Sequence, residues 1–122
     1  MKRGIAVNLA ALTLVAGAAV WALVIYEPVR VAGGSMEPAL RTGDVALVRR
    51  EALPHPGDIA LIAQPGHGPV LHRVIGRDQI GCLRTRGDAN ALEDFTPTLP
   101  EHVRGTVVLV VPVGSLLERW RR

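Results

Sequence analysis

The strongest constraint on this 122-residue chain is an uncharged apolar run from Gly4 to Tyr26, which reads GIAVNLAALTLVAGAAVWALVIY. About 20 apolar residues in a helix span the hydrocarbon core of a bilayer, so the run predicts a transmembrane helix over residues 4–26. Trp21 and Tyr26 lie near its far end, where amphipathic rings favour the membrane interface. One small domain then remains, residues 27–122.

A cleaved secretory signal is the alternative interpretation of the same run. Lys2 and Arg3 resemble its basic region, and the small residues at 16–18 resemble a cleavage site. The apolar core of such signals is usually about 7–15 residues long. The run is longer than that, which favours an uncleaved anchor.

Basic residues on the two sides of the run predict its orientation. Lys2 and Arg3 precede it, whereas Arg30 and Arg41 follow at a greater distance. Positive charge is enriched on the cytoplasmic side of a membrane helix. We therefore expect the first three residues, 1–3, to be cytoplasmic and residues 27–122 to be extracytoplasmic.

Charge in the domain argues against nucleic acid as a partner. Acidic and basic residues nearly balance there, whereas nucleic-acid binding needs a basic face. The basic residues gather at the end of the chain, in the segment LLERWRR over 116–122. Such a segment suits an anionic membrane surface. A frayed and solvated terminus is the alternative.

Short apolar segments separated by Gly and Pro predict a mainly β domain after the anchor. With nine prolines and thirteen glycines in the chain, a second long helix is not expected. A short helix is expected over 115–121. Strands are expected over 45–48, 59–62, 70–71 with 74–75, and 107–111, and turns over 43–44, 56–58, 65–68 and 86–88.

Cys82 is the single cysteine, which excludes an internal disulfide and a thiolate metal site. It lies between Ile80 and Leu83, so we expect it to be a small buried apolar residue.

The first candidate for chemistry is Ser35, in the stretch GGSMEPALRTGD from Gly33 to Asp44. A catalytic serine needs a base, an open approach and nearby N–H donors for an oxyanion. Gly33 and Gly34 allow a sharp turn and close approach of a substrate chain, and Pro38 stiffens the chain after the serine. An ordinary loop serine is the alternative.

Four histidines are candidate bases. His55, His67 and His102 lie in polar or Pro- and Gly-rich stretches and are expected to be solvated. His72 lies in the strand-like VLHRVIG, and an imidazole can act as base and then as acid near neutral pH. A half-buried strand histidine bonded to a backbone carbonyl is the alternative. Lys2 is the only lysine, so the domain holds no Ser–Lys pair.

Carboxylates near the two ends of the stretch GDANALED are candidates to orient the base. They are Asp88 and Asp94, the latter next to Glu93. A carboxylate beside a histidine fixes the histidine tautomer and stabilises the imidazolium. For Asp88 alone, a turn-forming role after Gly87 is the alternative.

Three blocks, GGSMEPALRTGD, LHRVIGRD and TRGDANALED, follow an N-terminal anchor in this order and resemble type I signal peptidases. The histidine in the second block resembles the subgroup of the endoplasmic reticulum, archaea and some Gram-positive bacteria. The resemblance implies the coiled β-sheet fold shared with repressor proteases. It also implies Ser35 as nucleophile, His72 as base, and Asp88 and Asp94 as acidic positions, with Asp94 slightly preferred as the closer partner. It implies no metal and no organic cofactor.

The resemblance also implies the substrate, which would be the signal peptides of exported preproteins, cut after small residues in an Ala-X-Ala pattern. We expect the peptide to add as a strand beside the chain near Ser35 and the strand before His72. Met36 and Leu40 are implied to line the −1 pocket. The connection from the anchor to Ser35 reaches at most about 30 Å, which places the site near the bilayer. Accessory secretion subunits are possible partners.

One position departs from the family pattern. The family often has a serine two residues before the nucleophile that assists the oxyanion hole, and here that position is Gly33. The oxyanion hole would then depend on backbone N–H groups, including that of Ser35.

Two rival functions are open to the sequence. A self-cleaving repressor-type protease needs a lysine base and a DNA-binding domain, which this chain lacks. A non-catalytic, membrane-tethered β-module that binds partners is the second.

Overall fold

The structure is a computed structural model that describes residues 2–122, so Met1 of the expected cytoplasmic segment lies outside the described residues. It begins with helix α1, Lys2–Ile25. At 1.5 Å per residue this helix is about 36 Å long. It is long and apolar enough to cross a membrane, judged by length and composition. The helix was expected to reach Tyr26, but it ends one residue earlier, at Ile25. The chain becomes extended there because it approaches Pro28, and proline disfavours helical backbone in the residue before it.

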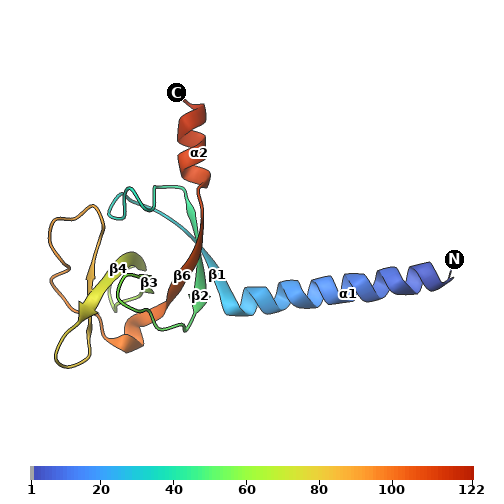
Figure 1. Ribbon diagram of the computed structural model, residues 1–122, viewed down its shortest axis with the longest axis horizontal. Helices are drawn as coiled ribbons and strands as arrows, with labels where there is room; N and C mark the ends of the chain where they lie inside the picture. The colour runs from blue at the N-terminus through green and yellow to red at the C-terminus, as the bar shows by residue number, and fades with distance from the viewer. Residues whose placement is uncertain (1) are drawn as a thin grey trace.

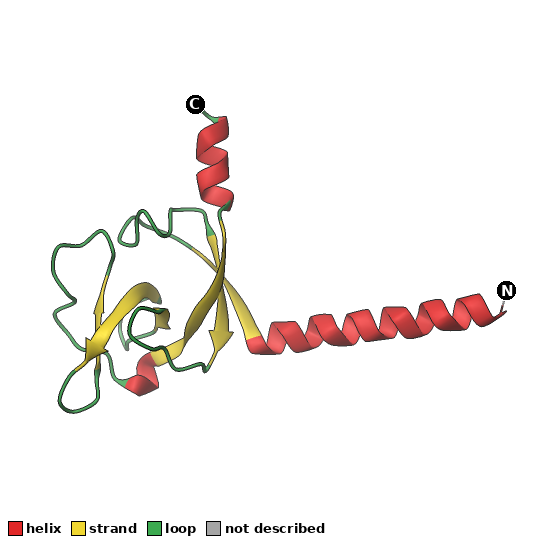
Figure 2. Ribbon diagram, viewed as in Figure 1, coloured by secondary structure: helices red, strands yellow, loops and turns green. Residues whose placement is uncertain are grey.

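The rest of the described chain forms one antiparallel sheet and two short helices (Figures 1 and 2). This confirms the mainly β fold. The sheet order is β1-β2-β6-β3-β4-β5. The elements are β1 (Tyr26–Arg30), β2 (Val45–Arg50), β3 (Ile59–Ile62), β4 (Val70–Arg77), β5 (Leu83–Arg86), the 3₁₀ helix η1 (Pro100–His102), β6 (Val103–Val111) and α2 (Val113–Trp120).

The sheet bends strongly because its ladders carry irregularities. The register shifts between Leu47 and Val48 against β6, between Leu61 and Ile62 against β6, and between Val74 and Gly76 against β5. A bulge of this kind bends the strand and increases its twist. In Figure 1 the β4 end of the sheet consequently curls away from the β1–β2–β6 end, to which α1 is attached.

Two strands have no counterpart among the expected ones. β1 has the sequence YEPVR and β5 the sequence LRTR, so neither shows a run of apolar residues. Both become strands through pairing with longer neighbours, β1 with β2 and β5 with β4. The C-terminal helix is present, but it begins at Val113, two residues before the expected start.

β3 lies near the middle of the sheet and is covered on both faces. Ala60 and Ile62 pack with Val74 and Leu83 on one face. Ile59 faces the other way, against a second cluster formed by Val31, Met36 and Leu40. The buried Cys82, as expected, is 6% exposed. The second cluster belongs to the loop that carries Ser35, so this loop is fixed against the sheet by packing in the core.

Leu61 tests how much the domain depends on β3. The side chain is 1% exposed, so we expect Leu61→Ala to lower the free energy of unfolding by about 2–5 kcal/mol. Urea unfolding in detergent, followed by the β-sheet signal in circular dichroism, measures this. Leu53→Ala is the matched control, because Leu53 is 61% exposed and its truncation should change stability by about 0.5 kcal/mol or less. Equal effects of the two substitutions would contradict a core centred on β3.

Candidate active site

Ser35 lies on a loop that leaves β1 and returns to β2. Backbone hydrogen bonds close the base of this loop, from the Val31 N–H to the Asp44 carbonyl (2.8 Å) and from the Gly43 N–H to the Val31 carbonyl (2.8 Å). Gly33 has a φ of 127°, a conformation that glycine adopts far more readily than any residue with a Cβ. The closed base and the glycine together project Ser35 over the sheet.

His72 lies in the first half of β4, opposite Ala60 of β3, and its imidazole faces Ser35. Its Nε2 is 3.3 Å from the Ser35 Oγ. The imidazole is mostly buried, with 12% of the side chain exposed. The structure thus brings together a hydroxyl and an imidazole from two distant blocks of the sequence, within hydrogen-bonding distance.

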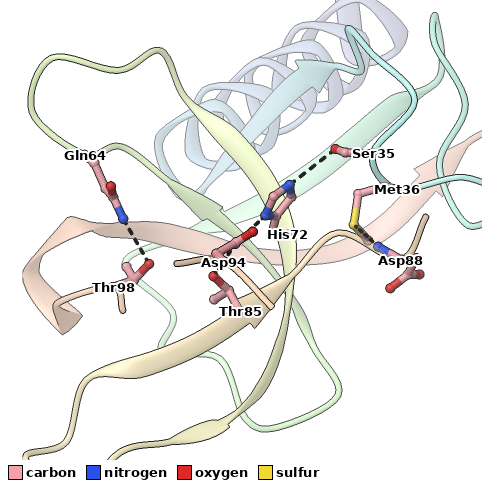
Figure 3. A network of polar contacts seen from close by, with 8 residues as sticks. All are labelled: Ser35, Met36, Gln64, His72, Thr85, Asp88, Asp94 and Thr98. Atoms are coloured by element: carbon pink, nitrogen blue, oxygen red, sulfur yellow. Dashed lines mark hydrogen bonds and ion pairs between the residues drawn. The ribbon is translucent and has the colours of Figure 1, made fainter. Parts of the chain in front are cut away.

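Asp94 lies on the other side of the same imidazole, with its Oδ2 2.6 Å from the His72 Nδ1 (Figure 3). The Thr85 hydroxyl donates to the same Oδ2 at 2.6 Å, and the Asp94 N–H donates to the Thr85 carbonyl at 2.8 Å. A carboxylate accepts hydrogen bonds, so the proton of the imidazole is held at Nδ1. The lone pair at Nε2 is then free to accept the Ser35 proton.

Asp88 contacts a different partner. Arg73 donates to its two carboxylate oxygens at 2.8 and 2.7 Å. Successive side chains of a strand point to opposite faces, so the neighbours His72 and Arg73 diverge and each meets its own aspartate. The two sequence candidates are therefore separated by the structure, with Asp94 bonded to the imidazole and Asp88 to the guanidinium.

A cleft of about 310 Å³ opens beside Ser35. It is lined by residues 29–33 and 69–71, together with Ser35 and Met36. Leu40 does not line this cleft; it is fully buried in the cluster behind it. Gly34 is likewise not part of the lining, whereas Gly33 is.

The backbone around Ser35 leaves donors available. Among residues 2–122, no protein group accepts the N–H of Ser35, whereas the Gly33 N–H donates to the Thr42 hydroxyl at 3.3 Å. A serine at position 33 would be strained at the φ found here, so the departure from the family pattern coincides with a backbone that favours glycine. The Ser35 N–H is thus unused by the described part of the fold.

The other histidines do not contact Ser35. His55 is largely exposed beside Asp58, and His102 accepts the Ala63 N–H through its backbone carbonyl. His67 lines a second cleft of about 270 Å³ on the Asp94 side of His72. Within the described part of the chain, no cluster of His, Cys, Asp or Glu is arranged to hold a metal ion.

Sequence reasoning missed three residues of this site: Arg73, Thr85 and Gly87. A Cβ on Gly87 would lie 2.6 Å from the Ser35 carbonyl oxygen and 3.2 Å from the His72 Nε2. Gly87 therefore lets two site segments approach each other. Thr85 was missed because LRTR has no run of apolar residues that would mark it as a strand.

Gly87 gives a prediction about geometry. Gly87→Ala should displace the Ser35 segment or the His72 ring, because the contact with a backbone oxygen cannot be relieved by a rotamer change. The His72 imidazole resonances in an NMR spectrum should shift while the circular dichroism stays native. Gly68→Ala is the control, since its Cβ would meet no atom within 4 Å. Unchanged His72 resonances in Gly87→Ala would contradict this packing.

The Arg73–Asp88 pair gives a prediction about pH. The hydrogen bonds from Arg73 hold the pKa of Asp88 below its ordinary value of 3.8. A lowered folded-state pKa stabilises the fold above the unfolded-state pKa, and the stabilisation is lost as the pH falls through the folded-state pKa. Wild type should therefore exceed Asp88→Asn in stability at about pH 6, and the difference should narrow towards about pH 3. Thermal unfolding of both proteins across this pH range measures the difference in stability. A difference that does not change with pH would contradict a stabilising ion pair between Arg73 and Asp88.

In chemical terms the site is a serine hydroxyl, an imidazole and a carboxylate in one line, next to a cleft. This constellation is that of nucleophilic acyl transfer by serine. It requires neither a metal nor an organic group to activate the hydroxyl.

Comparison with known proteins identifies the family of this chain. The chain matches the family described as "Signal peptidase, peptidase S26" over residues 4–80. It is 38% identical over 72 residues to the signal peptidase complex catalytic subunit SEC11 of Clavispora lusitaniae, covering 54% of this chain and 43% of that protein. It is 34% identical over 86 residues to signal peptidase I W of Bacillus subtilis, covering 65% and 45%. The chain thus spans about half the length of the curated relatives it matches. Since the family match covers more than half of the chain, this protein belongs to the peptidase S26 family of signal peptidases.

Proposed function

We propose that the chain is a membrane-anchored serine endopeptidase that removes signal peptides from exported preproteins. The observation that carries the proposal is the line Ser35–His72–Asp94, with contacts of 3.3 and 2.6 Å, beside an open cleft in a chain of this family. The relatives it matches are named as signal peptidases, and this chain corresponds to about half of each.

The proposed reaction proceeds through an acyl-enzyme. The Ser35 Oγ attacks the scissile carbonyl carbon while the His72 Nε2 takes the hydroxyl proton. The Ser35 N–H donates to the oxyanion that forms. His72 then passes its proton to the leaving amine, and the C–N bond breaks. Water, deprotonated by His72, then attacks the acyl carbon. The bond between this carbon and the Ser35 Oγ breaks, His72 returns the proton to Oγ, and the carboxylic acid product leaves.

Asp94 is proposed as the residue that orients the base. Its contact with Nδ1 keeps the tautomer in which Nε2 can accept a proton, and its charge stabilises the imidazolium. Thr85 holds Asp94 through the hydroxyl contact. Asp88 takes no part in this relay, because its two oxygens are bonded to Arg73.

The cleft beside Ser35 is the proposed substrate site. An extended peptide between residues 29–33 and 69–71 would hydrogen-bond to both backbone segments as an added strand. Its side chains would alternate between wall and solvent, so the −1 and −3 residues would face the same side. Met36 lines the cleft together with Ser35, and in this proposal its side chain limits the −1 position to small residues of the Ala-X-Ala type.

The proposed placement puts the N-terminus in the cytoplasm, α1 across the cell membrane and the domain outside. α1 continues into β1 without a loop, so the site is held close to the bilayer from which a signal peptide emerges. One relative is named as the catalytic subunit of a complex, which supports accessory subunits as proposed partners.

Purified full-length protein in detergent, incubated with a preprotein that carries an Ala-X-Ala site, tests the activity. We expect wild type to cleave after the second alanine, and Ser35→Ala or His72→Ala to lower kcat by about 10⁴-fold or more, because the two residues act as a unit. Mass spectrometry of the products measures both the rate and the cleavage position. If wild type cleaves no faster than Ser35→Ala, the proposed activity is wrong, and a non-catalytic β-module is favoured.

The two aspartates provide a matched comparison within the same assay. Asp94→Asn should lower kcat by about 10⁴-fold, since an amide can hold the wrong tautomer of the imidazole. Asp88→Asn leaves the contact between Asp94 and the imidazole in place, so it should lower kcat much less than Asp94→Asn does. The reverse order of the two losses would assign the orienting role to Asp88.

A further inference from the structure

Helix α2 presents its polar side to the domain and its apolar side to solvent. The Ser115 N–H and hydroxyl donate to the Asp44 carboxylate at 3.0 and 3.2 Å, and Asp44 is only 2% exposed. Glu118 forms an ion pair with Arg41 at 3.8 Å. These contacts fix which side of α2 packs on the domain.

The opposite side of α2 is an unpartnered apolar stripe. Val113, Leu116, Leu117 and Trp120 follow the i, i+3, i+4, i+7 spacing of one helical face, and their exposed fractions are 39%, 50%, 57% and 89%. A surface helix usually turns such a stripe towards a core. Exposed apolar residues continue into the preceding strand at Val108, Leu109 and Val111. An apolar partner outside the domain is therefore needed to cover this stripe.

The groups around the stripe are mostly basic. Arg119, Arg121 and Arg122 lie in and directly after α2. Leu117, at the edge of the stripe, lines a cleft of about 300 Å³ between α2 and the Ser35 loop. The charged residues of this cleft are the basic Arg30, Arg41 and Arg121 and the acidic Glu37 and Glu118. The excess of arginine favours a partner whose surface is negatively charged and whose interior is apolar.

The position of α2 relative to α1 identifies that partner. β1 and β6 both pair antiparallel with β2, so they run parallel to each other. α1 precedes the start of β1 and α2 follows the end of β6, so the two helices leave opposite ends of these strands. In Figure 1, α2 runs crosswise to α1, and the loop with Asp44 lies on the side of α2 away from α1. If α1 crosses a bilayer, α2 runs parallel to its surface, separated from the point where α1 enters by the length of the β1 and β6 strands.

We propose that α2 is an interfacial membrane helix, with its apolar stripe in the headgroup region of a bilayer that contains anionic lipid. Amphipathic helices with basic polar residues and an apolar stripe of Leu and Trp bind in this way. The proposal depends on the membrane placement of α1 described above, and it does not depend on peptidase activity.

This contact bears on the site because α2 is bonded to the Ser35 loop. A Cβ on Gly114 would lie within overlap distance of the Thr42 carbonyl oxygen, and the Thr42 hydroxyl accepts the Gly33 N–H at 3.3 Å. A membrane-bound α2 would hold this loop, and with it Ser35, at a fixed distance from the bilayer surface. It would add a second point of attachment to the one that α1 provides.

Tryptophan fluorescence of the full chain tests the proposal. The chain has two tryptophans, so Trp21→Phe leaves Trp120 as the single reporter. This protein is reconstituted into vesicles of phosphatidylcholine alone or mixed with phosphatidylglycerol. We expect blue-shifted emission, weak quenching by aqueous acrylamide, and strong quenching by lipids spin-labelled near the headgroup in the mixed vesicles. Water-like emission that acrylamide quenches freely in those vesicles would overturn the proposal.

Charge variants test the lipid preference. Replacing Arg119, Arg121 and Arg122 by Gln should lower the ratio of lipid-shielded to water-exposed Trp120 by about fivefold for each arginine removed. The triple control Arg77→Gln, Arg84→Gln, Arg104→Gln has the same net charge and leaves the α2 region intact, so it should keep the shielding. An equal loss in both triples, or shielding without anionic lipid, would contradict an anionic surface as the partner.

Two further readouts separate this proposal from its rivals. Shielding that rises with the protein-to-lipid ratio would indicate a second copy of the chain over the stripe and would overturn a lipid partner. Ser35→Ala should show the same Trp120 shielding as the parent protein. Loss of cleavage with retained shielding, or the reverse, therefore distinguishes failure of the function from failure of the membrane contact.

Discussion

The register of β4 between β3 and β5 is the constraint on which the site depends. It sets His72 opposite Ala60 and Val74 opposite Thr85, so the imidazole and the threonine hydroxyl belong to adjacent strands. The chain that follows β5 then returns to β5 with the Asp94 N–H bonded to the Thr85 carbonyl. A shift of one residue in this ladder would turn His72 to the opposite face, because side chains alternate along a strand.

The same alternation explains the two carboxylates. His72 and Arg73 are neighbours in sequence, yet one faces Asp94 and the other Asp88. The Arg73–Asp88 pair holds the turn after β5, whose Ala89 N–H donates to the Ser35 carbonyl at 2.9 Å. Asp88 thus supports the Ser35 loop through Arg73 and the turn, and the absence of a Cβ on Gly87 allows this close packing.

The loop with Ser35 is where the core, the site and α2 meet. Its inner residues Met36 and Leu40 are buried against the sheet, and its end, at Asp44, binds α2. A membrane contact at α2 would therefore act on the loop directly, and α1 acts on it through β1. The proposed peptidase and the proposed interfacial helix are consistent with each other, because both place the cleft next to the bilayer.

By itself, the sequence determined the apolar helix, the mainly β character of the rest, and the short list of candidate groups. These properties follow from composition and local pattern, so they can be predicted from short stretches of the sequence. Only the tertiary structure decided that Asp94 rather than Asp88 contacts His72, that Leu40 lies behind the cleft, and that LRTR is a strand with Thr85 in the site. It also decided that α2 turns its apolar stripe outward. The reason is physical: strand pairing and burial join residues that are far apart in sequence, and neither spacing nor propensity along the chain specifies which of them will meet.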